Sequence, residues 1–326
     1  MEFQNRRDWF SILGSTVIGL LTINSLSPLD NELSREIASN TVNLLFIFLG
    51  VGTLSLFLKK HYLMLSSFVA CIALCQFIKD AQSNEFAYSC PSQETQVTIA
   101  HITLDQDNSS EIAIENIKEV NAELIAIQIP QQEQAGQLFD RFLAKTHPYF
   151  QKISHNKGLD ILIYSKYPVS NLDTVSCNGN TNLAGSIFID SIHGKLDFIT
   201  GYLAQNQSGN TYVEAKNQLA RLSSYLGEDK TQPLLAIGAT RLASWSPEIQ
   251  EFKIEHALNG SRRDLELGYA DEYIFYSNHL ECVKFDYVLD GKGVLGTYQF
   301  KERKEEVAPA YHTSTFVSKA IISALH

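Results

Sequence analysis

Three long apolar segments open the chain, and shorter apolar runs follow them at regular intervals. The long segments cover residues 9–26, 41–58 and 62–78, and none contains Asp, Glu, Lys or Arg. A helix of 17 or 18 residues measures about 27 Å, close to the thickness of the hydrocarbon core of a bilayer. The pattern therefore predicts a membrane anchor over residues 1–82 with three transmembrane helices.

The first apolar segment has a second interpretation. It follows Arg6 and Arg7, as the apolar part of a cleavable signal peptide would. No small-x-small cleavage site stands at the matching place, and two further apolar segments follow at once. A membrane helix is therefore favoured over a signal peptide.

Charges in the short loops predict the orientation of the anchor. Arg6 and Arg7 precede the first segment and Lys59 and Lys60 precede the third, whereas the loop 27–40 holds three acidic residues and one Arg. By the positive-inside rule, the amino terminus is cytoplasmic. We therefore expect a bacterial inner-membrane protein whose partners include the lipid bilayer and whose large carboxyl-terminal domain is periplasmic.

Strands and helices alternate after a linker over residues 83–94. Because paired strands and crossover helices share one domain over 95–326, we expect mixed β-sheets with helices outside. Short buried or alternating runs predict strands, and helical periodicity predicts helices. The expected strands are 97–104, 124–129, 158–164, 184–192, 195–203, 234–237, 284–289, 293–300 and 313–321, and the expected helices are 111–120, 133–145, 212–226 and 247–258.

The aromatic residues between Tyr269 and Tyr287 leave two interpretations open. Tyr273, Phe275 and Tyr276 stand close together there, followed by Phe285. Tyrosine is favoured at contacts where one end of the ring stays wet, so the segment suits a binding face. The same residues suit the core of two strands equally well.

Charge argues against one class of partner. The chain has 26 Lys+Arg and 36 Asp+Glu, of which residues 1–89 hold 6 and 7, so the exterior domain carries a net charge of about −9. Nucleic-acid-binding domains normally show a basic surface. Nucleic acid is therefore not an expected partner.

The five cysteines divide by position. Cys71 and Cys75 lie in the third apolar segment and are expected to be small helix residues. The periplasm permits disulfides, and we expect Cys90 to pair with Cys177 because both stand in polar, irregular stretches, whereas Cys282 stands in a predicted strand. No His and Cys spacing is typical of a zinc site.

Three strand motifs carry a resemblance to a known family. They are Gly158-Leu-Asp-Ile-Leu-Ile-Tyr-Ser-Lys-Tyr-Pro-Val169, Leu234-Leu-Ala-Ile-Gly238 and Phe285-Asp-Tyr-Val-Leu289. In this order they resemble the endonuclease/exonuclease/phosphatase superfamily, and the three apolar segments with a basic turn before the third resemble its membrane-anchored bacterial members. The resemblance covers residues 95–324. It implies a four-layer α/β sandwich, with two mixed β-sheets flanked by helices.

The resemblance also implies where catalytic residues should stand. That family needs a divalent metal held by oxygen ligands, an Asp that activates water, and His residues that steady the phosphate. At the matching positions this chain has Thr103 instead of Asn, Ile129 instead of Glu, and Gly201 and Tyr202 in place of a His. Ala239 replaces the water-activating Asp.

Asp286 and His312 remain from the catalytic set. They match the family's final Asp–His dyad, and we interpret them as a leftover pair more readily than as a working site, since the metal and the base are missing together. The carboxylates of Asp105, Asp107 and Glu111 offer a weak alternative metal site, although an acidic run beside Asn108 and Ser109 is also typical of a helix start.

Three functions follow, in decreasing order of preference. The first is a catalytically inactive, phosphodiesterase-like domain that binds a membrane or periplasmic protein, with no cofactor. The second is a divergent phosphodiesterase or phosphatase that uses Mg²⁺ or Mn²⁺. The third is a module that binds a small anionic or sugar ligand.

Overall fold

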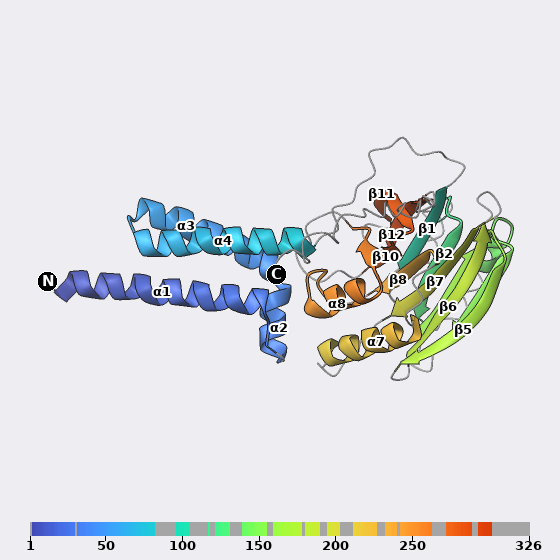
Figure 1. Ribbon diagram of the computed structural model, residues 1–326, viewed down its shortest axis with the longest axis horizontal. Coiled ribbons are helices and arrows are strands. Elements are labelled where there is room, and N and C mark those ends of the chain that lie inside the picture. The colour runs from blue at the N-terminus through green and yellow to red at the C-terminus, as the bar shows by residue number, and fades with distance from the viewer. Residues whose placement is uncertain are drawn as a thin grey trace, which may run out of the picture.

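The computed structural model describes residues 2–29, 31–81, 96–104, 117, 121–130, 139–154, 159–177, 180–189, 194–202, 211–226, 232–239, 242–262, 272–288 and 293–301. These residues form a helical bundle at the amino end and an α/β domain beyond it (Figure 1).

The bundle contains α1 (Glu2–Leu26), α2 (Glu32–Ser39), α3 (Thr41–Phe57) and α4 (His61–Ala81). The long helices lie side by side, and α2 crosses the end that faces the α/β domain (Figure 1). Among the described helices, two are long and apolar enough to cross a membrane, α1 over Trp9–Leu26 and α4 over its whole length. The third predicted span, α3, has only 17 residues. It is long enough to cross a membrane only when it is counted together with α2, and the two helices are bent by 72° relative to each other.

Two six-stranded sheets make the centre of the α/β domain. Each sheet contains one parallel pair, β1 with β2 and β7 with β8, and all other neighbours are antiparallel. The first sheet has the order β11 (Leu280–Val288), β12 (Gly293–Phe300), β1 (Gln96–Thr103), β2 (Leu124–Pro130), β4 (Leu159–Ser165), β3 (Tyr149–Ser154). The second has the order β5 (Val169–Cys177), β6 (Asn180–Ile189), β7 (Gly194–Tyr202), β8 (Leu234–Ala239), β10 (Tyr273–Ser277), β9 (Leu258–Gly260).

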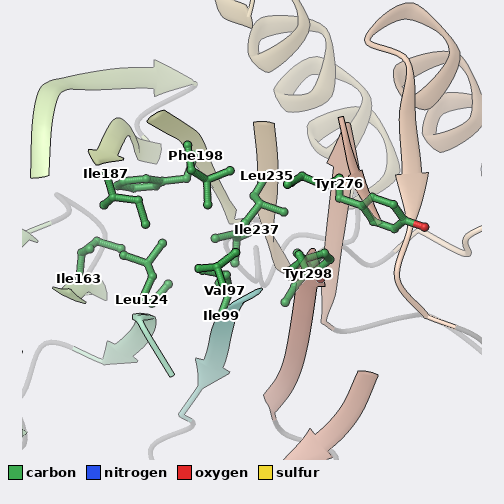
Figure 2. Close-up of a cluster of buried hydrophobic side chains, with 14 of the residues drawn as sticks. Val97, Ile99, Leu124, Ile163, Ile187, Phe198, Leu235, Ile237, Tyr276 and Tyr298 are labelled. Carbon is green, nitrogen blue, oxygen red and sulfur yellow. The ribbon is translucent and has the colours of Figure 1, made fainter. Parts of the chain in front are cut away.

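Apolar side chains fill the space between the sheets and both outer faces. Strand side chains alternate, so Ile99 of β1 and Ile237 of β8 meet in the inter-sheet core, as Figure 2 shows. The outer face of the first sheet packs against Ile117, Phe139 and Leu143. The outer face of the second packs against α7 (Thr211–Leu226) and α8 (Pro247–Glu255). The predicted four-layer α/β sandwich is confirmed.

The structure corrects two details of the expected elements and decides one interpretation that the sequence left open. The helix expected over 247–258 ends at Glu255, because Ala257 adopts a left-handed backbone with a φ of 50° and Leu258 begins β9. Strands β3, β5 and β9 were not predicted from the sequence. In the aromatic segment, Tyr273, Phe275 and Tyr276 are buried, so the core interpretation holds for these three.

Some expectations lie outside the described residues. They are the linker 83–94, the strand 313–321, residues 133–138 of the helix expected over 133–145, and all of the helix 111–120 except Ile117.

Candidate functional site

The carboxyl ends of the parallel strands define the candidate site. Such ends are where ligands bind in many α/β folds, because the loops that follow them converge there. Strands β1 and β2 end at Thr103 and Pro130, and β7 and β8 end at Tyr202 and Ala239.

A buried carboxylate and imidazole join the two sheets at this edge. Glu272 lies directly before Tyr273, which pairs with Gly238 near the end of β8. Its carboxylate contacts Nδ1 of His101 on β1, and the two side chains are 4% and 0% exposed. Nε2 of His101 has no hydrogen-bond partner within the described part of the chain. A carboxylate that fixes one imidazole nitrogen and leaves the other free is the arrangement found in general-base dyads, but here it is sealed inside the core.

Sequence reasoning missed this pair. The available signal was the polar His101 on the inward face of β1, the face that also carries Val97 and Ile99. Its partner is far away along the chain, so only the packing of the sheets identifies it.

Gln128 and Thr103 form a neutral pair beside His101. They are register partners on β2 and β1, and the Thr103 hydroxyl lies 3.5 Å from Oε1 of Gln128. Gln128 is 1% exposed, and its Nε2 has no described partner. Its neighbour Ile129 packs in the outer cluster of the first sheet. The polar side chain that faces the inter-sheet space at the end of β2 is therefore the neutral amide of Gln128, and not a carboxylate.

The ends of β7 and β8 leave little room for functional side chains. The Thr200 hydroxyl accepts a hydrogen bond of 2.8 Å from the Leu183 backbone nitrogen. A Cβ at Gly238 would collide with the carbonyl oxygen of Gly201. The close approach of these two backbone segments therefore requires glycine at position 238. A Cβ at Gly201 would lie 2.6 Å from the Tyr273 hydroxyl. Burial, reinforced by Glu272, raises the pKa of Tyr273, which keeps this phenol neutral.

Solved structures with the same arrangement identify the fold. The human Nocturnin catalytic domain with bound sulfate superposes with a TM-score of 0.51 at 12% identity, over 64% of this chain and 95% of that one. An endonuclease/exonuclease/phosphatase from Beutenbergia cavernae gives 0.50 at 13%, over 63% and 72%. A family protein from Bacteroides thetaiotaomicron gives 0.50 at 12%, over 64% and 98%. This is the endonuclease/exonuclease/phosphatase fold.

Sequence comparison alone does not reach that conclusion. No protein-family model matches the chain, and no curated protein matches it either. With identities of 12 or 13%, the likeness to endonuclease/exonuclease/phosphatase structures establishes the fold and leaves the chemistry to the residues themselves.

Asp286 does not point into the inter-sheet space of this endonuclease/exonuclease/phosphatase fold. The rings of Phe285 and Tyr287 contact each other, with centroids 5.5 Å apart, so they share one face of β11. Asp286 is on the opposite face, where its carboxylate lies 2.5 Å from Nζ of Lys284 and its side chain is 46% exposed. His312 is outside the described residues, so the predicted Asp286–His312 dyad stays a prediction.

The remaining predicted site residues also lie partly or wholly outside the described chain. Asp105, Asp107 and Cys90 fall in gaps, and Cys177 is the last residue of β5. The disulfide between Cys90 and Cys177 thus stays a prediction. Cys71, Cys75 and Cys282 form no disulfide within the part of the chain that the structure describes.

The described residues do not fit the divalent metal that endonuclease/exonuclease/phosphatase chemistry implies. Within the described ranges no three His, Cys, Asp or Glu residues form a group that could hold an ion. At the strand ends, Thr103 and Gln128 offer only a hydroxyl and an amide. Hard cations prefer several carboxylate oxygens, so these neutral groups are a poor ligand set.

Proposed function

We propose that the chain is a membrane-tethered, catalytically inactive phosphodiesterase-like subunit that binds a protein partner in the bacterial envelope. The observation that carries this proposal is the chemistry of the strand ends. Thr103, Ile129, Gly201 and Ala239 stand where a metal-dependent hydrolase of this fold needs oxygen ligands, a base and a hydrogen-bond donor to the phosphate. Without them, most of the electrostatic stabilisation of a phosphoryl-transfer transition state is lost.

Exposed apolar surface supports the membrane tether. Most of the large apolar side chains that remain exposed lie between Trp9 and Ile72. A soluble protein rarely leaves so large an apolar area in contact with water, whereas transmembrane helices place such an area against lipid.

The arrangement of the bundle supports the proposed orientation. The basic turn with Lys59 and Lys60 and the start of α1 lie at the end of the bundle away from the α/β domain (Figure 1). Basic residues favour the cytoplasmic side, so the domain belongs on the periplasmic side.

A phosphodiesterase assay tests the inactivity directly. The full chain in detergent, with Mg²⁺ or Mn²⁺, is expected to hydrolyse bis(p-nitrophenyl) phosphate no faster than buffer, and Mn²⁺ is expected to leave its melting temperature unchanged. The chain should also copurify with a partner subunit in constant stoichiometry. Metal-dependent turnover that disappears in His312→Ala would overturn the proposal.

The contact between His101 and Glu272 favours a second candidate, a divergent phosphoesterase. An imidazole nitrogen without a described partner, beside a carboxylate that contacts the other ring nitrogen, is the arrangement of a general-base dyad, and opening of the sheet edge would have to expose it. Under that alternative, His101→Gln abolishes turnover while the fold persists. Under the binding function, the same variant has no turnover to lose.

A further inference from the structure

The α/β domain is docked on the anchor through one continuous segment, residues 242–253. The Trp245 indole Nε1 donates a 2.8 Å hydrogen bond to the carbonyl oxygen of Ala38, near the end of α2. Glu248 of α8 forms a 2.8 Å ion pair with Arg35 of α2. Lys253 Nζ donates a 3.0 Å hydrogen bond to the carbonyl oxygen of Ala81, which ends α4.

An apolar cluster seals the same junction. Its members from the anchor and the domain are Val42, Ile78, Ala81, Ala243 and Trp245. Trp245 is 2% exposed, and the side chains of Arg35 and Glu248 are 13% and 7% exposed. Removing one partner of a buried Arg–Glu pair while the other stays buried is costly, because the remaining charge is uncompensated. Docked and undocked arrangements are therefore two distinct states, in contrast to a flexible tether.

The docking segment begins where the candidate site ends. Ala239 is the last residue of β8, and Ala243 already belongs to the buried junction. Four residues of extended chain span at most about 14 Å, so the strand edge and the anchor are linked over a short distance. Ser246 then caps α8 and Pro247 occupies its first turn, which fixes the direction of the helix as it leaves the junction.

We propose that this junction couples the anchor to the strand edge. This coupling rests on the proposed function, because the envelope partner proposed there acts on the domain through the anchor. A partner that displaces the ends of α2 or α4 pulls on Trp245 and α8 and so loosens the end of β8. By linkage, a ligand that stabilises the strand edge strengthens the docking to the same extent.

Hydrogen exchange of the full chain in detergent tests the coupling. Arg35→Met is expected to accelerate amide exchange in β8 and in residues 242–246 by about tenfold, because it frees a buried carboxylate at the junction. Trp245→Phe keeps an aromatic ring but removes the N–H donor and part of the buried indole, so exchange in the same segments should accelerate about fivefold. Lys166→Met is the matched control, since it removes an ion pair with Glu123 within the domain.

The outcomes separate coupling from other effects. Faster exchange confined to β8 and the docking segment supports the proposal. Exchange in β8 that stays at the wild-type rate in both junction variants overturns it and indicates a flexible tether. If Arg35→Met accelerates exchange in β4 and β12 as well, the domain has lost its fold in this variant. The exchange rates of Trp245→Phe then test the coupling. The measurement needs no partner and no substrate, so its failure leaves the question of catalytic inactivity to the phosphodiesterase assay.

Discussion

The inter-sheet core and the junction between anchor and domain are both buried, yet different interactions hold them. In the core, the residues shared by the two sheets are almost all aliphatic or aromatic (Figure 2). The contact between His101 and Glu272 is an exception. In the junction, three side chains of the domain donate hydrogen bonds to carbonyl groups at helix ends, and an ion pair adds a fourth polar contact.

This difference separates stability from orientation. Apolar burial is nondirectional and contributes in proportion to the area removed from water. Hydrogen bonds to helix-end carbonyls contribute less net free energy, but their geometry admits one arrangement. We infer that the core determines whether the domain folds, whereas the junction determines how the folded domain sits on the anchor.

The largest effect is expected from truncating the core. Phe198 of β7 is 1% exposed and packs against Gly185 of the neighbouring strand. Phe198→Ala should lower the free energy of unfolding by about 3–5 kcal/mol, because it removes a buried ring and leaves a cavity. Urea unfolding of the full chain in detergent measures the loss.

Phe188 provides the control for that substitution. It lies on β6 and is 46% exposed, so Phe188→Ala should cost well under the core value, about 1 kcal/mol or less. Equal losses at Phe188 and Phe198 would contradict the assignment of the inter-sheet space as the main source of stability.

An intermediate effect is expected from Lys253 at high pH. Burial lowers the pKa of this ammonium group to about 8, from an ordinary value of 10.5. Below pH 8 the group is charged in both folded and unfolded chains, so it adds no pH dependence. Between about pH 8 and 10.5, Lys253 is protonated in the unfolded chain and neutral in the folded chain. The unfolded chain therefore binds one more proton, and the free energy of unfolding rises with pH.

A comparison with Lys253→Met isolates this contribution. Between pH 7.5 and pH 10, the free energy of unfolding of the wild type should rise by about 1–3 kcal/mol relative to that of the variant, as measured by urea unfolding at both pH values. Lys216→Met, on the exposed face of α7, should show no such change. A difference between wild type and Lys253→Met that stays constant or shrinks as the pH rises would show that the ammonium is not buried at the junction.

Much of the core could be predicted from the sequence, because central strands are apolar on both faces. Strand β2 reads Leu-Ile-Ala-Ile-Gln-Ile-Pro, and its limits were predicted to within one residue. Strands β3 and β5 were missed, since both are edge strands of their sheets and carry many polar residues. An edge strand has only one neighbouring strand and is partly exposed to solvent, so its sequence lacks the continuous apolar run that is typical of a central strand.

The candidate site and the junction were harder to predict for a related reason. The absence of a carboxylate at Ile129 and Ala239 can be seen in the sequence once the family is suspected. The contact of His101 with Glu272, and that of Trp245 with Ala38, join residues that have no local pattern in common. Pattern analysis finds the faces of elements but does not find which faces meet.

The smallest effect is expected from Gln250, at the rim of the junction. Its side-chain nitrogen donates hydrogen bonds of 3.2 Å to the Ala81 carbonyl oxygen and 2.5 Å to that of Ser244. Gln250→Ala should lower the free energy of unfolding by about 1 kcal/mol, because water can reach a half-buried site and replace part of what is lost. Glu251→Ala, on the exposed side of α8, should leave it unchanged. A loss at Gln250 as large as that at Phe198 would mean that the junction, and not the inter-sheet core, dominates the stability of the domain.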